Sequence, residues 1–158
     1  MIQLQRTNSD NEGFRLLIRE LDKELRSRYA EQQDVYDQHN IIESNPNVLV
    51  AYKEGKAVGC GCFKKFDEES VEIKRMYVKA EYRGQKIAAQ ILQELEKWAT
   101  ELKIFTTVLE TGNKQHEAIH LYRKSGYIVV ENYGPYKNLP DSVCMKKQLV
   151  SHNFTSPA

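Results

Sequence analysis

A chain of 158 residues is long enough for one domain with a substantial core, so we expect a single domain over residues 1–150 and a flexible C-terminal tail over 151–158. Its 23 lysine and arginine residues balance 22 acidic ones, and a net charge of +1 excludes a general electrostatic attraction to nucleic acid. Without an apolar run of about 18 residues, the sequence predicts no membrane span or membrane partner. Three cysteines suit core positions in a reducing cytoplasm better than disulfides or a zinc site.

The N-terminal half predicts a strand, a helix and three further strands. IQLQR alternates as a short strand, and Asp10 is placed to cap the helix that follows. The apolar positions of this helix recur at helical spacing and are Phe14, Leu17, Ile18, Leu21 and Leu25. The pattern weakens over residues 26–47, which we expect to form a short helix and loops that shape a pocket. NVLVAY and AVGCGCF then predict two strands around a glycine-containing turn, and VEIKRMYV predicts a third.

The C-terminal half begins with the clearest helix of the sequence, in the stretch after KAEYRGQK. Its apolar stripe consists of Ile87, Ala88, Ile91, Leu92, Leu95, Trp98, Ala99 and Leu102. IFTTVLE predicts a buried strand, and a second helix follows and ends at Gly126. YIVVENY and DSVCMKKQL can pair as a closing hairpin around Gly134 and Pro135. This order predicts an α/β (α+β) fold in which a mixed, mostly antiparallel sheet of about six or seven strands is flanked by helices.

The stretch HEAIH at residues 116–120 matches the helical H-E-x-x-H pattern of zinc hydrolases. In that pattern two histidines bind zinc and the glutamate serves as general base. At 100° per residue, His116 and His120 fall opposite the apolar stripe of their helix. We therefore expect two solvated histidines and no metal site, and a zinc hydrolase using His116, Glu117 and His120 is the weakest of the three functions considered.

The junction KAEYRGQKIA, from a strand to a long helix, has the features of an anion site. The first amides of a helix are unpaired and carry partial positive charge. Arg83 and Lys86 add full charges, and Gly84 allows the main chain to approach a ligand closely. On these residues alone, a helix start with exposed basic side chains is an equally good interpretation.

Two motifs together make the sequence resemble the GNAT superfamily of acetyl-CoA-dependent N-acetyltransferases. RGQKIA at residues 83–88 is similar to the family's pyrophosphate loop Q/R-x-x-G-x-G/A, with Lys86 where the pattern has its first glycine. A second family pattern, A-x-x-L-Y-x-x-x-G-F/Y, is matched by Ala118, Leu121, Tyr122, Gly126 and Tyr127. The motifs occur in the family's order, and the resemblance spans roughly residues 48–149. It implies a GNAT-like acyl-CoA N-acyltransferase fold.

The resemblance also implies roles for individual residues. Tyr122 would be the acid that protonates the leaving thiolate, and Glu72 would be the base that takes the proton of the amine. The alternative for Tyr122 is a core tyrosine whose hydroxyl bonds a main-chain carbonyl. For Glu72 a structural ion pair with Lys74 or Arg75 is an equal alternative. The main chain of Met76 and Val78 would bind the pantetheine arm, and Gln115 stands where the family has an asparagine. The implied cofactor-binding residues are Met76, Tyr77, Val78, Arg83, Gly84, Gln85, Lys86, Ile87, Ala88 and Gln115.

The implied function is transfer of an acetyl group from acetyl-CoA to a primary amine, by direct attack in a ternary complex. We expect no metal, a small amine rather than a protein as acceptor, and a chain that can form a homodimer. The acceptor site would be bounded by residues 26–47 and by the loop NYGPYKNLPD. The alternative from another class is a non-catalytic acyl-CoA-binding regulatory module, which would keep the Arg83 loop and make Glu72 and Tyr122 dispensable.

Overall fold

The computed structural model describes residues 1–28 and 43–150, so the predicted tail and most of the 26–47 segment lie outside the described residues. The elements run in the order β1 (Ile2–Thr7), α1 (Glu12–Arg28), β2 (Val48–Lys53), β3 (Lys56–Lys65), β4 (Ser70–Val78), η1 (Ala80–Tyr82), α3 (Ile87–Glu101), β5 (Thr106–Gly112), α4 (His116–Lys124), β6 (Ile128–Val130), η2 (Gly134–Tyr136) and β7 (Ser142–Gln148). None of these helices is long and apolar enough to cross a membrane.

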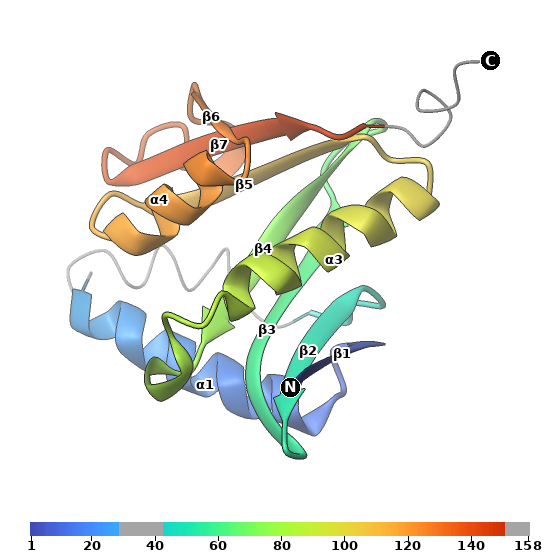
Figure 1. Ribbon diagram of the computed structural model, residues 1–158. Coiled ribbons are helices and arrows are strands. Elements are labelled where there is room, and N and C mark those ends of the chain that lie inside the picture. Colours follow the sequence, from blue (N-terminus) through green and yellow to red (C-terminus); the bar gives the residue numbers. More distant parts are fainter. Residues whose placement is uncertain (29–42, 151–158) are drawn as a thin grey trace. The chain divides into compact units, whose positions relative to one another are not determined.

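The described strands form a seven-stranded sheet in the order β1-β2-β3-β4-β5-β7-β6 (Figure 1). The pairs β1–β2, β2–β3, β5–β7 and β6–β7 are antiparallel, whereas β4 and β5 are parallel. This arrangement confirms the predicted mixed, mostly antiparallel sheet. The chain divides into two compact units, of which unit 1 is Met1–Cys62 with Arg75–Leu92 and unit 2 is Phe63–Lys74 with Gln93–Ala158. The single domain over residues 1–150 stays a prediction.

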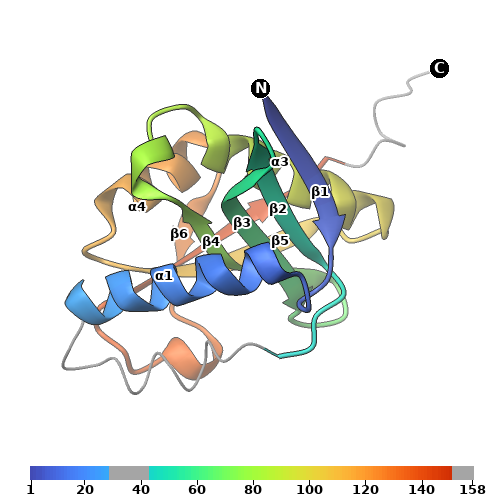
Figure 2. The ribbon, with the colours of Figure 1, turned by 90° about the horizontal axis from the view of Figure 1, so that it is seen from below.

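Unit 1 has its core between α1 and the strands β2, β3 and the end of β4. Figure 2 shows α1 running alongside these strands. The apolar stripe predicted for α1 is confirmed, since its buried members contact strand residues in one cluster made of Phe14, Leu17, Ile18, Leu21, Val48, Val50, Cys60, Cys62 and Tyr77. The two cysteines are therefore core residues, as predicted.

The N-cap of α1 differs from the predicted one. The backbone N–H of Phe14 donates to Asn11 Oδ1 at 2.9 Å, so Asn11 caps the helix rather than Asp10. The Asp10 carboxylate instead lies 3.6 Å from the Arg15 guanidinium. Both residue types make good caps, and the helix begins one position later than the sequence pattern indicated.

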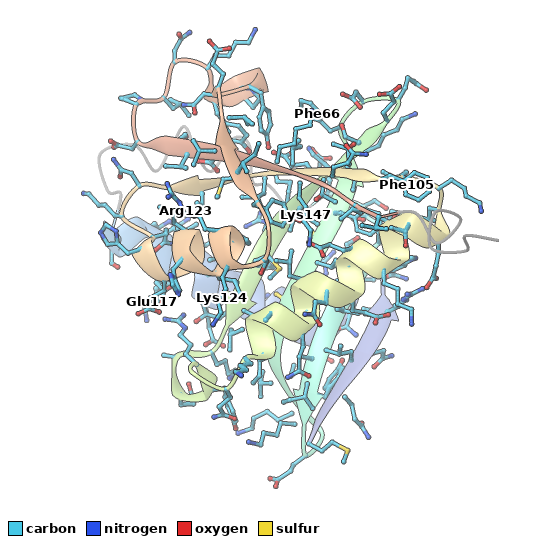
Figure 3. All side chains as sticks on the ribbon, turned by 45° about the horizontal axis from the view of Figure 1, so that its top comes forward. Phe66, Phe105, Glu117, Arg123, Lys124 and Lys147 are labelled. Atoms are coloured by element: carbon cyan, nitrogen blue, oxygen red, sulfur yellow. The ribbon has the colours of Figure 1, made fainter. Side chains whose placement is uncertain are left out.

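Unit 2 is held together by a buried polar network as well as by apolar packing. The Tyr127 hydroxyl donates to Glu96 Oε2 of α3 at 2.8 Å and lies 2.8 Å from the Thr107 hydroxyl of β5. Lys147 extends from β7 toward α3 (Figure 3) and donates to Glu96 Oε1 at 3.0 Å. These bonds join α3, β5 and β7 around one tyrosine. Gly126 follows α4 with φ +101°, which confirms it as the residue that ends this helix.

Candidate active site

The predicted phosphate loop lies in unit 1, between the end of β4 and the start of α3. Met76, Tyr77 and Val78 are the last residues of β4, and Ile87 and Ala88 open α3. The loop between them turns twice through left-handed backbone, at Gly84 with φ +82° and at Lys86 with φ +65°. The second value explains why the family pattern has a glycine where this chain has a lysine, because a side chain is strained in that conformation.

The Arg83 side chain is already engaged within unit 1. Its Nε donates to the Val78 carbonyl at 2.8 Å, and its Nη2 donates to Glu24 Oε1 at 2.9 Å. The guanidinium also lies over the Tyr77 ring, 5.4 Å from the ring centroid. A ligand that reached this guanidinium would compete with Glu24 for it.

A further cation near the loop, Lys53, was not predicted from the sequence. Lys53, at the end of β2, donates from Nζ to Gln85 Oε1 at 3.1 Å. Lys53 and Gln85 are far apart in the sequence, and only the β2–β3 hairpin brings the lysine to the loop. Lys53 and Lys86 thus lie close to the start of α3, and the first amides of a helix also favour anions.

The two predicted catalytic residues, Glu72 and Tyr122, lie in unit 2, which also holds the end of the β4–β5 ladder. This ladder pairs Ser70–Ile73 with Thr106–Leu109 and goes no further. Lys74 and Glu110 are therefore the first residues past the paired section. Cross-strand partners share a face of the sheet, so Glu72 and Lys74 of β4 lie on the same face as Glu110.

Glu72 is buried, with 5% of its surface exposed, and both of its oxygens have a partner. The Tyr133 hydroxyl donates to Oε2 at 2.8 Å, and the Lys74 ammonium lies 4.0 Å from Oε1. The ion pair with Lys74 is one of the alternatives that the sequence left open. Arg75, the other alternative partner, instead pairs with Asp22 at 3.0 Å within unit 1.

Glu110 is a second carboxylate beside the end of the β4–β5 ladder, and it was not predicted from the sequence. The Ser142 hydroxyl of β7 donates to Glu110 Oε2 at 2.8 Å. Burial, together with the nearby charge of Glu72, raises the pKa of Glu110 to about 7, although the Ser142 hydrogen bond and the Lys74 ammonium act in the opposite direction. In the sequence, Glu110 is recognisable only as a carboxylate near the end of a buried strand. Its position near Glu72 depends on the parallel register of β4 and β5, which a single sequence does not reveal.

Tyr122 lies on α4 with 6% of its surface exposed, and its ring meets that of Tyr127 edge to face at 5.9 Å. Its hydroxyl makes no hydrogen bond to any residue within 1–28 or 43–150. Burial, and then the charge of Glu110, raise the pKa of Tyr122, so this phenol stays protonated at neutral pH. Gln115 immediately precedes α4.

The HEAIH motif lies on the solvent-exposed side of α4. His116 and His120 are exposed, and Glu117 lies on the exposed side of α4 (Figure 3). Among the described residues, no three histidine, cysteine or acidic side chains are grouped so that they could hold a metal ion.

Comparison with known proteins gives consistent matches. The model of the acetyltransferase (GNAT) family matches residues 14–127. An IAA acetyltransferase of Azospirillum brasilense is 36% identical over 84% of this chain and 88% of its own length. A Klebsiella pneumoniae protein proposed to be an acyl-CoA N-acyltransferase has 32% identity and a TM-score of 0.79, covering 95% of this chain and 99% of its own. An Elizabethkingia anophelis GNAT acetyltransferase with bound acetyl-CoA shares the fold, with 21% identity and a TM-score of 0.65 over 94% of this chain and 98% of its own.

Proposed function

The chain belongs to the GNAT acetyltransferase family, and on that premise we propose that it moves an acetyl group from acetyl-CoA to a primary amine by direct attack in a ternary complex. The observation that carries the proposal is the buried hydroxyl of Tyr122, which has no hydrogen-bond partner in the described part of the chain. A tyrosine with a purely structural role would bond its hydroxyl to the protein, since a buried hydroxyl left unpaired costs about 1–3 kcal/mol.

The adjacent Tyr127 gives the comparison, because its hydroxyl is bonded to both Glu96 and Thr107. Of this ring pair, Tyr122 is thus the member whose hydroxyl has no hydrogen-bond partner within residues 1–28 and 43–150, and we infer that this hydroxyl bonds a ligand. We assign it to the sulfur of the thioester, where it protonates the leaving thiolate. A phenol held neutral by burial is suited to that task, because it gives up its proton only when a strong base forms beside it.

We assign the diphosphate of acetyl-CoA to the loop of residues 83–88. The main-chain amides at the start of α3 are the proposed donors, in the manner of other helix starts that bind phosphate. Lys86 and Lys53 supply positive charge, and Gln85 is held by Lys53. The main chain of Met76 and Val78 is proposed to bind the pantetheine arm, Tyr77 to support Arg83, and Gln115 to contact the cofactor from the start of α4.

The acceptor is an ammonium ion at neutral pH and must lose a proton before it attacks. We assign this proton to the carboxylates of β4 and β5, of which Glu72 is the one that the sequence predicts. Negative charge on Glu72 and Glu110 and the rings of Tyr133 and Tyr136 nearby favour a cationic acceptor. The residues are few and close together, which suits a small amine better than a protein segment.

The proposal is tested by a screen of amines, amino acids and peptides, with IAA included because of the Azospirillum relative. Released coenzyme A is measured by thiol detection and the acetylated product by mass. We expect steady turnover with a subset of small primary amines, and a loss of roughly 100-fold or more in Tyr122→Phe. Binding of acetyl-CoA without any acetylated product across the panel would overturn the proposal and favour a regulatory acyl-CoA-binding module.

A further inference from the structure

Glu72 and Glu110 differ in what their oxygens contact. Both oxygens of Glu72 face a protein donor, Oε2 the Tyr133 hydroxyl at 2.8 Å and Oε1 the Lys74 ammonium at 4.0 Å. Glu110 accepts one hydrogen bond, from Ser142 to Oε2 at 2.8 Å. Its Oε1 has no hydrogen bond or ion pair to a residue of the described ranges. Of the two carboxylates, Glu110 is therefore the one with an oxygen available to a substrate.

The position of Glu110 is also the more open one. Glu72 lies within the paired section of the β4–β5 ladder, opposite Val108, whereas Glu110 is the first β5 residue beyond the last pair, Ile73 with Leu109. On its other side β5 continues to pair with β7, where Glu110 is opposite Cys144. The carboxylate is thus fixed in place by one strand while the space toward β4 is no longer closed by a backbone ladder.

We propose that Glu110 takes the proton of the acceptor ammonium and that Glu72 is the fixed negative charge beside it. This inference rests on the proposed acetyl transfer and divides its proton chemistry between two residues. Glu110 is then a catalytic residue, whereas Glu72, Lys74 and Ser142 act through it. The charge of Glu72 attracts the ammonium, and the Ser142 hydroxyl fixes the orientation of the Glu110 carboxylate.

The electrostatics agree with this division. A general base works best when its pKa is close to the working pH, and the pKa of Glu110 is raised to about 7. The titratable groups that interact with Glu110 come from four elements, and they are Glu72, Lys74, Tyr122, Tyr136 and Cys144. Glu72 raises the pKa of Glu110, and Lys74 and Ser142 lower it.

The proton chemistry then couples the base to the acid. The ammonium gives one proton to Glu110, and its nitrogen forms a bond to the thioester carbon. The carbon–sulfur bond breaks, and the thiolate takes the proton of the Tyr122 hydroxyl. A second proton from the new amide nitrogen restores that hydroxyl, while Glu110 releases its proton to solvent. Because the charge of Glu110 raises the pKa of Tyr122, protonation of Glu110 lowers that pKa when the thiolate leaves.

The experiment is the pH dependence of kcat/KM for acetyl transfer to an amine found in the screen, in the wild type and four variants. The wild type should lose activity below a midpoint near pH 7. Glu110→Gln keeps an acceptor for the Ser142 hydroxyl. Its kcat/KM should be 100-fold or more below that of the wild type and should no longer fall below pH 7. Glu72→Gln should move the midpoint to lower pH, and Ser142→Ala should move it to higher pH. Glu117→Gln, which removes an exposed carboxylate of α4, should match the wild type.

Opposite shifts in Glu72→Gln and Ser142→Ala are not expected from a structural role, and they remain measurable if Glu110→Gln folds poorly. An active Glu110→Gln protein with the wild-type profile, or midpoints unmoved in the other two variants, would overturn the assignment and leave the proposed function intact. A wild-type protein that acetylates no amine while binding acetyl-CoA would overturn both.

Discussion

Tyr122 and Tyr127 meet edge to face with ring centroids 5.9 Å apart, but only Tyr127 has hydrogen-bond partners for its hydroxyl among the described residues. Removing each hydroxyl should therefore have opposite effects. Tyr122→Phe should leave the free energy of unfolding unchanged or raise it by up to about 1 kcal/mol, because an unpaired buried hydroxyl is lost. Tyr127→Phe should lower it by about 1–3 kcal/mol and leave Glu96 with one donor fewer.

The measurement is urea unfolding of both variants beside their acetyl-transfer rates. We expect Tyr122→Phe to be stable and inactive, and Tyr127→Phe to be less stable with much of its turnover retained at low temperature. A destabilised Tyr122→Phe protein would show that its hydroxyl has a structural partner, which is the alternative to the acid role.

The left-handed backbone at Lys86 gives a prediction on stability. With φ at +65°, a lysine at this position is strained, and Lys86→Gly should stabilise the protein by about 0.5–1 kcal/mol after allowance for the greater freedom of glycine in the unfolded chain. Lys103 follows the end of α3 with the same φ of +65° and provides the matched control. Both variants should show a similar rise in thermal midpoint, and a fall in Lys86→Gly alone would mean that the lysine side chain stabilises the loop.

The ion pair between Arg83 and Glu24 gives a prediction on cofactor affinity. Glu24→Gln removes a competitor for the guanidinium, so the affinity for coenzyme A should increase about 3- to 10-fold at low salt, in line with roughly 1 kcal/mol for a partly exposed pair. Glu20→Gln removes the same charge from α1, but Glu20 pairs with Lys79 at 3.4 Å and not with the loop. It should change the affinity less than twofold by isothermal titration. Equal effects of the two variants would indicate a general charge effect.

The raised pKa of Glu110 makes the stability of the protein depend on pH. Its folded-state pKa of about 7 lies above the ordinary value of 4.5, so the stability associated with its protonated form is complete below pH 4.5 and is lost as pH rises through 7. The free energy of unfolding of Glu110→Gln should therefore be similar to that of the wild type at pH 5. At pH 8.5 it should be higher than that of the wild type, by at most about 3 kcal/mol. Urea unfolding at the two pH values measures this, with Glu117→Gln as control. A variant that is less stable than the wild type at pH 8.5 would contradict the assigned pKa.

Much of the fold could be predicted from the sequence because its periodicities are strong. The apolar stripe of α1, the stripe of α3 as far as Ala99, the paired strands around Gly55 and the end of α4 next to Gly126 follow from residue spacing and glycine. The predicted stripe of α3 is wrong at Leu102, which lies beyond the end of the helix and is 49% exposed. The predicted site residues of the loop follow from a local motif. Glu110, Lys53 and the partners of Glu72 do not, because they depend on strand register and on contacts between distant segments, which no single stretch of sequence contains.

The central claim is that acetyl-CoA binds with its diphosphate on the loop of residues 83–88 and its sulfur beside Tyr122. A crystal structure of the protein with coenzyme A tests this claim most directly. We predict phosphate oxygens within hydrogen-bonding distance of the amides at the start of α3, and the sulfur within reach of the Tyr122 hydroxyl. Coenzyme A bound at another surface, with the loop empty and the Tyr122 hydroxyl bonded to protein, would contradict the account.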